Sequence, residues 1–237
     1  MKDAINRLYR TIFCRGGHGV HSPFVFDLIT TVIEEKCLYY CYARLKHVRE
    51  LLCRNRDKVE YHNRRYAVND FLNSFCFSER DDKLLFRLAN RFQPQTIYIT
   101  GSDLGLAPLY LTSWSESAVC TVFEPEPSLA AIAEEIIKKH SPASIDINVI
   151  YNPEIAEGSV FDFIVVGKTF SIDDFDRFLS HINDNSVMVI SEINSSAKNR
   201  NKWKMVCVSP KVTVTIDMYS LGIVFFNPKL HRKTYKN

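Results

Sequence analysis

The stretch Thr96-Ile-Tyr-Ile-Thr-Gly-Ser-Asp-Leu-Gly-Leu-Ala107, followed by Val119-Cys-Thr-Val-Phe-Glu124, sets the organisation of this chain. Its first five residues are β-branched or aromatic and predict a short buried strand. Gly101 permits a sharp turn in which the backbone can come close to a ligand, and Gly105 stands at the start of an apolar helical pattern. A second strand ends on Glu124, an acid placed to accept hydrogen bonds from ribose hydroxyls. This order predicts a nucleoside-binding crevice, although glycine turns also occur at strand ends for purely structural reasons.

The pattern resembles motif I and the following acidic position of class I S-adenosylmethionine-dependent methyltransferases, particularly their small-molecule O-methyltransferase-like branch. That branch carries Glu-x-Gly-x3-Gly. Here Gly101 and Gly105 match the glycines, Glu124 matches the ribose-binding acid, and Ile99 departs from the first acidic position. The resemblance implies S-adenosylmethionine as cofactor, held by Thr100, Gly101, Ser102, Asp103, Gly105 and Glu124.

In the resembling enzymes the first-strand acid helps to hold the amino group of the cofactor, which Ile99 cannot do. Thr100 and Ser102 can supply hydroxyls, and Asp103 can supply a carboxylate from one turn later. Asp103 fits equally well as the N-cap of the helix that begins near Gly105, because aspartate side chains accept hydrogen bonds from the first N–H groups of helices. The sequence leaves both roles open.

Residues 1–77 have the pattern of a helical extension. Ser22 followed by Pro23 is a typical helix start, with serine as N-cap and proline at the first helical position. A further helix is expected over Leu38–Leu52. The polar and basic segment 54–69 is expected to be a loop or a mobile lid.

The segment His18-Gly-Val-His-Ser-Pro-Phe-Val-Phe26 holds two histidines beside the start of a helix. His21 can act as a base or a substrate ligand, because histidine titrates near neutral pH. Both histidines can equally stabilise a turn by bonding to the backbone. The stretch also resembles a signature ahead of the methyltransferase domain in a group of bacterial relatives, which implies that the N-terminal helices pack over the cofactor end of the sheet. His21 is therefore a candidate catalytic residue.

Strands and helices alternate to the C-terminus and predict a Rossmann-like α/β domain over 78–237. A helix covers Glu79–Phe92, and a strand over 161–166 is apolar throughout, as a central parallel strand is. Two strands joined by a short turn, Val212–Met218 and Gly222–Asn227, predict an antiparallel hairpin. The other expected elements are helices over 125–139 and 172–182, strands over 145–150 and 186–190, and a basic helix or loop over 198–206. The resemblance implies the class I methyltransferase fold, a mostly parallel seven-stranded sheet with a C-terminal antiparallel hairpin.

Two strand ends depart from the O-methyltransferase pattern. In those enzymes the fourth strand ends in Asp and the fifth supplies Asp-Asp or Asp-Asn, which together hold a divalent cation. This chain has Gly167-Lys168 and Ser191-Glu192 instead. One carboxylate does not make a magnesium site, so no catalytic metal is expected. Lys168 is a candidate general base or ligand for an anionic substrate, and Glu192 is a candidate catalytic carboxylate.

Composition describes a soluble protein with one α/β domain and an extension. The chain has 237 residues, of which 46% are hydrophobic and 24% charged, and this excludes a disordered chain. It has neither an apolar run of membrane-spanning length nor an apolar signal core, so a cytoplasmic protein is expected. The seven cysteines are odd in number and irregularly spaced, which indicates reduced, buried thiols rather than disulfides or zinc.

The net charge of +3 is unevenly distributed. Residues 1–66 hold 13 Lys/Arg and 7 Asp/Glu, residues 67–195 hold 8 and 19, and residues 196–237 hold 9 and 1. Basic ends can attract an anionic substrate or a nucleic acid. No recognisable RNA- or DNA-binding module accompanies them, so nucleic acid is not the expected partner. The sequence does not decide the oligomeric state and is compatible with a homo-oligomer.

These features predict S-adenosylmethionine-dependent, metal-independent methyl transfer to a small molecule that the sequence does not identify. The cofactor's sulfonium already makes the methyl carbon electrophilic, so the protein has mainly to position a nucleophile. The absence of acids at positions 99, 167 and 191 fits an inactive binding or scaffolding protein as the alternative. A third alternative, methylation of RNA or another polyanion, depends on the basic ends alone.

Overall fold

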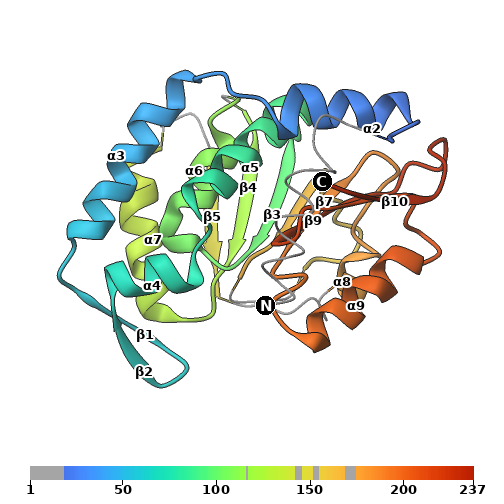
Figure 1. The fold of residues 1–237 in the computed structure, drawn as a ribbon. Helices are drawn as coiled ribbons and strands as arrows, with labels where there is room; N and C mark the ends of the chain where they lie inside the picture. Colours follow the sequence, from blue (N-terminus) through green and yellow to red (C-terminus); the bar gives the residue numbers. More distant parts are fainter. Residues whose placement is uncertain (1–18, 116, 142–145, 152–154, 169–174) are drawn as a thin grey trace. The chain divides into compact units, whose positions relative to one another are not determined.

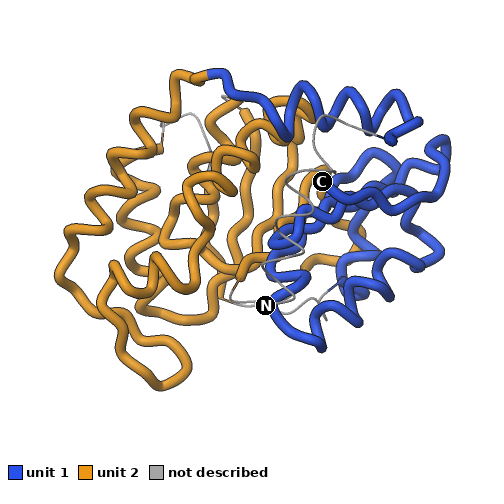
Figure 2. The backbone as a smooth tube through the Cα atoms, viewed as in Figure 1, with its two compact units in different colours: residues 1–37, 172–237 blue, residues 38–171 orange. Residues whose placement is uncertain are grey.

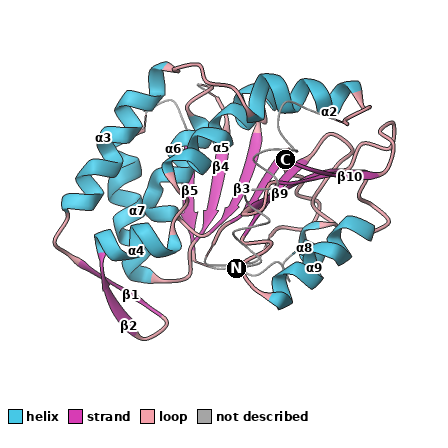
Figure 3. Cartoon of the chain, viewed as in Figure 1, coloured by secondary structure: helices cyan, strands magenta, loops and turns pink. Residues whose placement is uncertain are grey.

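The computed structural model describes residues 19–115, 117–141, 146–151, 155–168 and 175–237 (Figure 1). The chain divides into two compact units. Unit 1 holds residues 1–37 and 172–237, and unit 2 holds residues 38–171 (Figure 2). Each unit combines helices with strands (Figure 3). His18 lies outside the described residues, and the division into an extension 1–77 and a domain 78–237 stays a prediction.

The larger sheet contributes four parallel strands to unit 2: β3 (Thr96–Thr100), β4 (Val119–Phe123), β5 (Asp146–Ile150) and β6 (Phe163–Val166). Their order is β6-β3-β4-β5. β3 pairs with β4 along its whole length, so Thr100 lies opposite Phe123 at the carboxyl ends of the two strands. Every residue of β6 is buried, which explains its unbroken apolar sequence. The strands expected around the glycine turn are confirmed.

The described part of unit 2 has five α-helices: α3 (Tyr40–Arg54), α4 (Val68–Phe75), α5 (Glu79–Phe92), α6 (Leu106–Thr112) and α7 (Pro127–His140). α5 has the expected bounds. It begins after Ser78, whose hydroxyl accepts the Asp81 N–H at 3.2 Å, and it ends at Gln93, where φ is +49°. α3 packs against α4 and α6, and α6 also packs against α5 and α7.

The segment 54–69 is largely a β-hairpin, and the expectation of a loop was wrong. β1 (Lys58–Tyr61) pairs antiparallel with β2 (Arg64–Ala67). The two-residue turn, His62-Asn63, has φ of +50° and +60°, as a hairpin turn with both central residues left-handed requires. Burial alternates along β1. This period of two extends over only four residues of a basic segment, so it did not stand out in the sequence.

Unit 1 has four strands among its described residues: β7 (Val187–Ser191), β8 (Val214–Asp217), β9 (Leu221–Phe225) and β10 (Lys233–Lys236). Their order is β10-β8-β9-β7, with β9 antiparallel to β7 and β8. The expected C-terminal hairpin is thereby confirmed. β10 pairs parallel to β8 and was not expected, because three of its four residues are exposed and polar. The described residues therefore hold eight strands of the larger sheet where seven were expected.

The helices described in unit 1 are α2 (Pro23–Leu28), continued by the π-helical turn η1 (Ile29–Ile33), α8 (Phe175–Phe178) and α9 (Ala197–Val208). Ser22 caps α2 and Pro23 is its first residue, as predicted. Trp203 of α9 covers Gly222 of β9. A Cβ at Gly222 would lie 2.4 Å from the indole ring, so this approach of helix and strand requires glycine.

The six described cysteines are free. Cys41, Cys76 and Cys120 are buried, whereas Cys37 and Cys53 are exposed. The expectation of buried thiols was therefore right for only some of them.

Candidate functional site

The chain between β3 and α6 is a tight loop of left-handed backbone. φ is +84° at Gly101, +49° at Asp103, +52° at Leu104 and +88° at Gly105. The Gly101 N–H donates to the Phe123 carbonyl at 2.8 Å, so the loop starts from the paired ends of β3 and β4. A left-handed conformation is unfavourable outside glycine, and such positions are common at ligand sites. The loop is therefore the first candidate for a binding element.

Glu124, directly after β4, holds this loop in place. Its Oε2 accepts the Ser102 N–H at 2.9 Å and the Ser102 hydroxyl at 2.8 Å, and its Oε1 accepts the Glu126 N–H at 3.2 Å. Burial raises the pKa of Glu124, and these donors oppose that shift. A carboxylate has about four acceptor sites, so Glu124 keeps one for a hydroxyl of a ligand. The Ser102 hydroxyl is itself fully buried in this contact.

Asp103 does not cap α6, because the N-cap of that helix is Gly105, with no side-chain cap bond. Its Oδ1 accepts the backbone N–H of Phe77 at 2.7 Å. Its Oδ2 is buried and has no hydrogen-bond partner among the described residues. Burial raises the pKa of Asp103 to about 6, against the opposing positive charge of Arg49. Of the two roles that the sequence left open for Asp103, the capping role is excluded.

These groups line a pocket within unit 2 that has about 250 Å³ of empty space, part of it open to solvent. Gly101, Asp103 and Glu124 come from the cofactor-binding set expected from the sequence. The other lining residues are Phe71, Phe75, Cys76, Phe77, Gly167 and Lys168. Because this figure includes space open to solvent, and small-ligand pockets typically measure about 300–1,000 Å³, a ligand of cofactor size requires this pocket to widen.

Gly167 provides a physical reason for the missing acid after β6. Its N–H donates to the Thr100 carbonyl at 3.0 Å and to the Thr100 hydroxyl at 3.3 Å. A Cβ on Gly167 would lie 2.3 Å from the Thr100 carbonyl oxygen, a backbone atom that cannot rotate aside. No side chain fits, so the aspartate of the resembling enzymes is incompatible with this backbone. Thr100, which is buried, serves here to join β3 to the end of β6.

Gly105 brings the start of α6 close to α7. A Cβ at Gly105 would lie 3.1 Å from the Ala133 carbonyl oxygen and from Ile136 Cγ2, and φ there is +88°. Both facts favour glycine for packing. Gly105 is not among the residues that line the pocket, and its role in cofactor binding stays a prediction.

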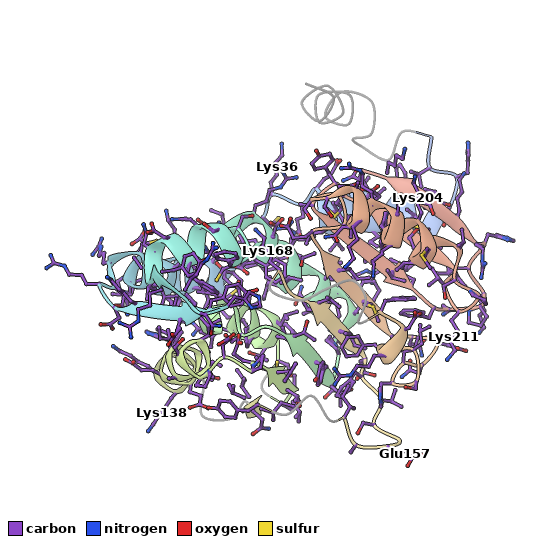
Figure 4. All side chains as sticks on the ribbon, turned by 90° about the horizontal axis from the view of Figure 1, so that it is seen from below. Lys36, Lys138, Glu157, Lys168, Lys204 and Lys211 are labelled. Atoms are coloured by element: carbon purple, nitrogen blue, oxygen red, sulfur yellow. The ribbon has the colours of Figure 1, made fainter. Side chains whose placement is uncertain are left out.

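Lys168 brings a positive charge to the pocket wall. Lys168 is partly buried, and Figure 4 shows it near the middle of the view, whereas the exposed Lys138 of α7 extends from the edge of the molecule. The charge of Lys168 lowers the pKa of Asp103, although less than Arg49 does. The two roles expected for Lys168, general base and anion ligand, stay predictions.

Glu192 and His21 belong to unit 1. Glu192 has φ of +57°, and its backbone carbonyl accepts the hydroxyl of Ser195 and the side-chain amide of Asn199, both at 2.9 Å. These bonds order the turn before α9 and do not involve the carboxylate. His21 is exposed and directly precedes Ser22, the cap of α2. Catalytic roles for both residues stay predictions.

The sequence did not reveal the pocket wall formed by α4 and the segment after it. Phe71 and Phe75 lie one helical turn apart with ring centroids separated by 5.1 Å, and Phe77 follows them. Their spacing indicates one face of a helix, but it does not say which pocket that face covers. The sequence also did not single out Arg49 and Asp82, which lie behind Asp103.

Methyltransferases of known structure share this fold. An O-methyltransferase from Bacillus cereus in complex with SAH has a TM-score of 0.55 and 15% sequence identity, over 85% of this chain and 97% of that chain. The O-methyltransferase TomG from Streptomyces achromogenes in complex with SAM has a TM-score of 0.53 and 14% identity, over 85% and 94%. A putative caffeoyl-CoA O-methyltransferase from Staphylococcus aureus has a TM-score of 0.57 and 14% identity, over 77% and 91%.

The chain therefore has the α/β Rossmann-like methyltransferase fold that the sequence predicted. No family profile matches the amino-acid sequence, and no curated protein matches it either. In the part of the chain that the structure describes, no three His, Cys, Asp or Glu side chains gather as a metal site requires. No helix in that part combines the length and the apolar character needed to cross a bilayer.

Proposed function

We propose that this chain binds S-adenosylmethionine in the pocket of unit 2 and transfers its methyl group to a small molecule. The observation that carries the proposal is the Glu124 carboxylate, which Ser102 orients beside the left-handed loop at the carboxyl ends of β3 and β4. Ligands of open parallel α/β sheets bind beyond such strand ends. Solved structures of the same fold with SAM or SAH bound support this choice of cofactor.

The residues of the pocket fit the chemistry of this cofactor. Glu124 keeps an acceptor site for a ribose hydroxyl. Asp103 Oδ2 is buried and unpaired among the described residues, and a positively charged amino group would remove the cost of that missing bond. Phe71, Phe75 and Phe77 supply apolar surface. Since the empty space is about 250 Å³, we expect the wall formed by α4 to shift when the cofactor binds.

Bound S-adenosylmethionine would supply an electrophilic methyl group. The chain then has to hold the acceptor in line with that group, which alone lowers a barrier substantially. Lys168 is the pocket cation that we assign to the acceptor, either as a base for its proton or as a partner for its negative charge. We infer a metal-independent reaction, because the backbone at Gly167 has no room for the acid that would help to hold a cation.

Replacing Glu124 is expected to weaken cofactor binding. Hydrogen bonds to charged groups contribute about 1.5–3 kcal/mol, so Glu124→Ala should weaken binding of S-adenosylmethionine roughly 10- to 100-fold. Isothermal titration calorimetry measures this. Glu124→Gln keeps an acceptor for the Ser102 N–H. It therefore tests whether the weaker binding comes from the lost carboxylate or from a disordered loop. Glu135→Ala on the exposed face of α7 is the matched control and should bind normally. If the unmodified chain does not bind at millimolar cofactor, the proposed function is wrong.

Replacing Lys168 distinguishes its two possible roles. A general base contributes about 10²- to 10⁴-fold to turnover, so Lys168→Met should lower kcat by that factor if Lys168 takes the proton. If Lys168 instead holds an anionic acceptor, KM should rise and Lys168→Arg should restore it. SAH release from S-adenosylmethionine, measured across a panel of phenols, amines and thiols, provides both constants. Unchanged kcat and KM in Lys168→Met would remove Lys168 from the reaction.

The second candidate is a binding protein that keeps the fold without catalysis. The close contact between Gly167 and Thr100 favours it, because a position that carries an acid in the resembling enzymes is closed to any side chain. Such a protein would bind S-adenosylmethionine and release no SAH with any member of the panel. Turnover with one acceptor would exclude it.

A further inference from the structure

A buried ion pair lies behind the pocket of unit 2. Nη2 of Arg49, on α3, donates to Oδ2 of Asp82, on α5, at 2.5 Å. The exposed fractions of the two side chains are 13% and 0%. The same Nη2 donates to the Phe77 carbonyl at 2.8 Å. Arg49 therefore connects two helices to the segment that forms one wall of the pocket.

Asp103 holds the same segment from the pocket side. Asp103 Oδ1 accepts the Phe77 N–H, while Arg49 donates to the Phe77 carbonyl. Arg49 and Asp103 are thus joined through a single residue. Three atoms of this cluster are buried without a hydrogen-bond partner in the described residues: Arg49 Nε, Asp82 Oδ1 and Asp103 Oδ2. Buried polar atoms normally have partners, so the cluster is incomplete as it stands.

The charges of the cluster are unequal, because one arginine faces two carboxyl groups. Burial and then the charge of Asp103 raise the pKa of Asp82, against Arg49. Burial raises the pKa of Asp103 to about 6, against Arg49, the Phe77 N–H, the Cys76 thiol and Lys168. Two interacting carboxyls titrate as a pair. Near neutral pH, one of the two carboxyl groups therefore carries a proton for part of the time. A further positive charge next to them would favour loss of that proton.

We propose that the buried Arg49–Asp82 pair positions Asp103 through Phe77 and sets its charge, so that Asp103 Oδ2 receives the positively charged group of a ligand in the pocket. The ligand's amino group, as an ammonium, would occupy the place opposite Asp103 Oδ2, and the carboxyl proton would pass to solvent. No covalent bond changes. Arg49 and Asp82 are positioning residues here, and neither lines the pocket. The inference rests on the proposed cofactor, which carries such an ammonium group.

The sign of the pH dependence follows from the raised pKa of Asp103. The cation binds the ionised carboxylate, and the ionised fraction falls as the pH drops through about 6. Affinity for S-adenosylmethionine should therefore weaken about tenfold between pH 7 and pH 5. Calorimetry near pH 6 in two buffers of different ionisation enthalpy should detect proton release on binding. Neutral 5′-methylthioadenosine, which lacks the ammonium group, should release no proton.

Three variants test whether this cluster, and no other group, causes the pH dependence of cofactor binding. Asp82→Asn keeps the shape but removes one charge, so its affinity for S-adenosylmethionine should weaken much less between pH 7 and pH 5 than that of the unmodified chain. Asp103→Asn should bind weakly at both pH values without proton release. Glu79→Gln changes the partly exposed pair that Glu79 forms with Lys83 on α5 at 2.5 Å, and it should behave as the unmodified chain. Any pH dependence contributed by Glu124 would persist in Asp82→Asn, which identifies it.

A direct titration makes the test independent of the cofactor. The side-chain carboxyl ¹³C shift of Asp103 should titrate with a midpoint near pH 6, and the midpoint should fall in Asp82→Asn. A midpoint near that of an ordinary aspartate overturns the inference. Cofactor binding with the same proton release in the unmodified chain and in Asp82→Asn also overturns it, while leaving the proposed function intact. A chain that does not bind S-adenosylmethionine contradicts both.

Discussion

Arg49→Met is expected to destabilise the chain by about 3–5 kcal/mol at pH 7.5, which is the usual cost of leaving one partner of a buried ion pair without the other. Asp82 is completely buried, and among the described residues it forms an ion pair with Arg49 alone, at 2.5 Å. Methionine fills similar space but cannot donate to Asp82 or to the Phe77 carbonyl. The free energy of unfolding from urea titration measures the loss.

The pH dependence and a double variant test the cause of this loss. Because the pKa of Asp82 is raised by burial, an unpaired Asp82 takes up a proton as the pH falls. The penalty of Arg49→Met should be complete at high pH and shrink toward pH 5. Adding Asp82→Leu removes the buried charge, so the double variant should be more stable than Arg49→Met alone. If the double variant is no more stable than Arg49→Met alone, or if the losses of the two single variants simply add, the unpaired charge of Asp82 is not the cause of the loss.

A partly exposed pair on the same helix is the control. Lys83→Met breaks the contact of Lys83 with Glu79, which has the same length of 2.5 Å but lies at side-chain exposures of 27% and 33%. Surface ion pairs contribute about 0–1 kcal/mol, so this variant should change stability by no more than that. A loss as large as that of Arg49→Met would show that burial is not the cause.

Gly167→Ala is expected to destabilise the chain by about 3 kcal/mol, at the upper end of the range for overpacked sites. The added Cβ would lie 2.3 Å from the Thr100 carbonyl oxygen, and relief requires β6 to move away from β3. Such a movement would also lengthen the hydrogen bond from the Gly167 N–H to that oxygen, now 3.0 Å. Thermal and urea unfolding measure the effect. Gly167→Asp should be at least as unstable, so restoring the acid of the resembling enzymes should not create a metal site.

Gly158→Ala provides the comparison for this prediction. Gly158 has φ of +82°, and no atom lies within 4 Å of the position its Cβ would take. Its replacement by alanine should therefore cost only what a left-handed backbone costs an L-residue, about 1–2 kcal/mol. Gly167 does not have a left-handed φ, so its loss would come from the steric contact. Equal losses at the two glycines would contradict that explanation.

Local patterns predicted the elements that form the candidate site. The apolar strand Thr96–Thr100, the glycines at 101 and 105 and the acid at 124 are close in sequence, and the structure places the loop and the acid together. Failures occurred where the local signal is weak. The β1–β2 hairpin has four-residue strands in a basic segment, and β10 has a single buried side chain. Both elements depend on pairing with a neighbouring strand more than on their own hydrophobicity.

The sequence by itself determined the strand, glycine turn, helix and acid of the βαβ core, because periodicity and glycine content act over a few residues. Tertiary structure alone decided what surrounds Asp103. Arg49 and Asp82 are 33 residues apart, and Phe77 and Asp103 are 26 residues apart. Isolated charges at such separations leave no periodic pattern, so their pairing depends on how α3, α5 and the loop after β3 pack. The same packing placed Gly167 against Thr100 and left Asp103 with an unpaired oxygen among the described residues of the pocket.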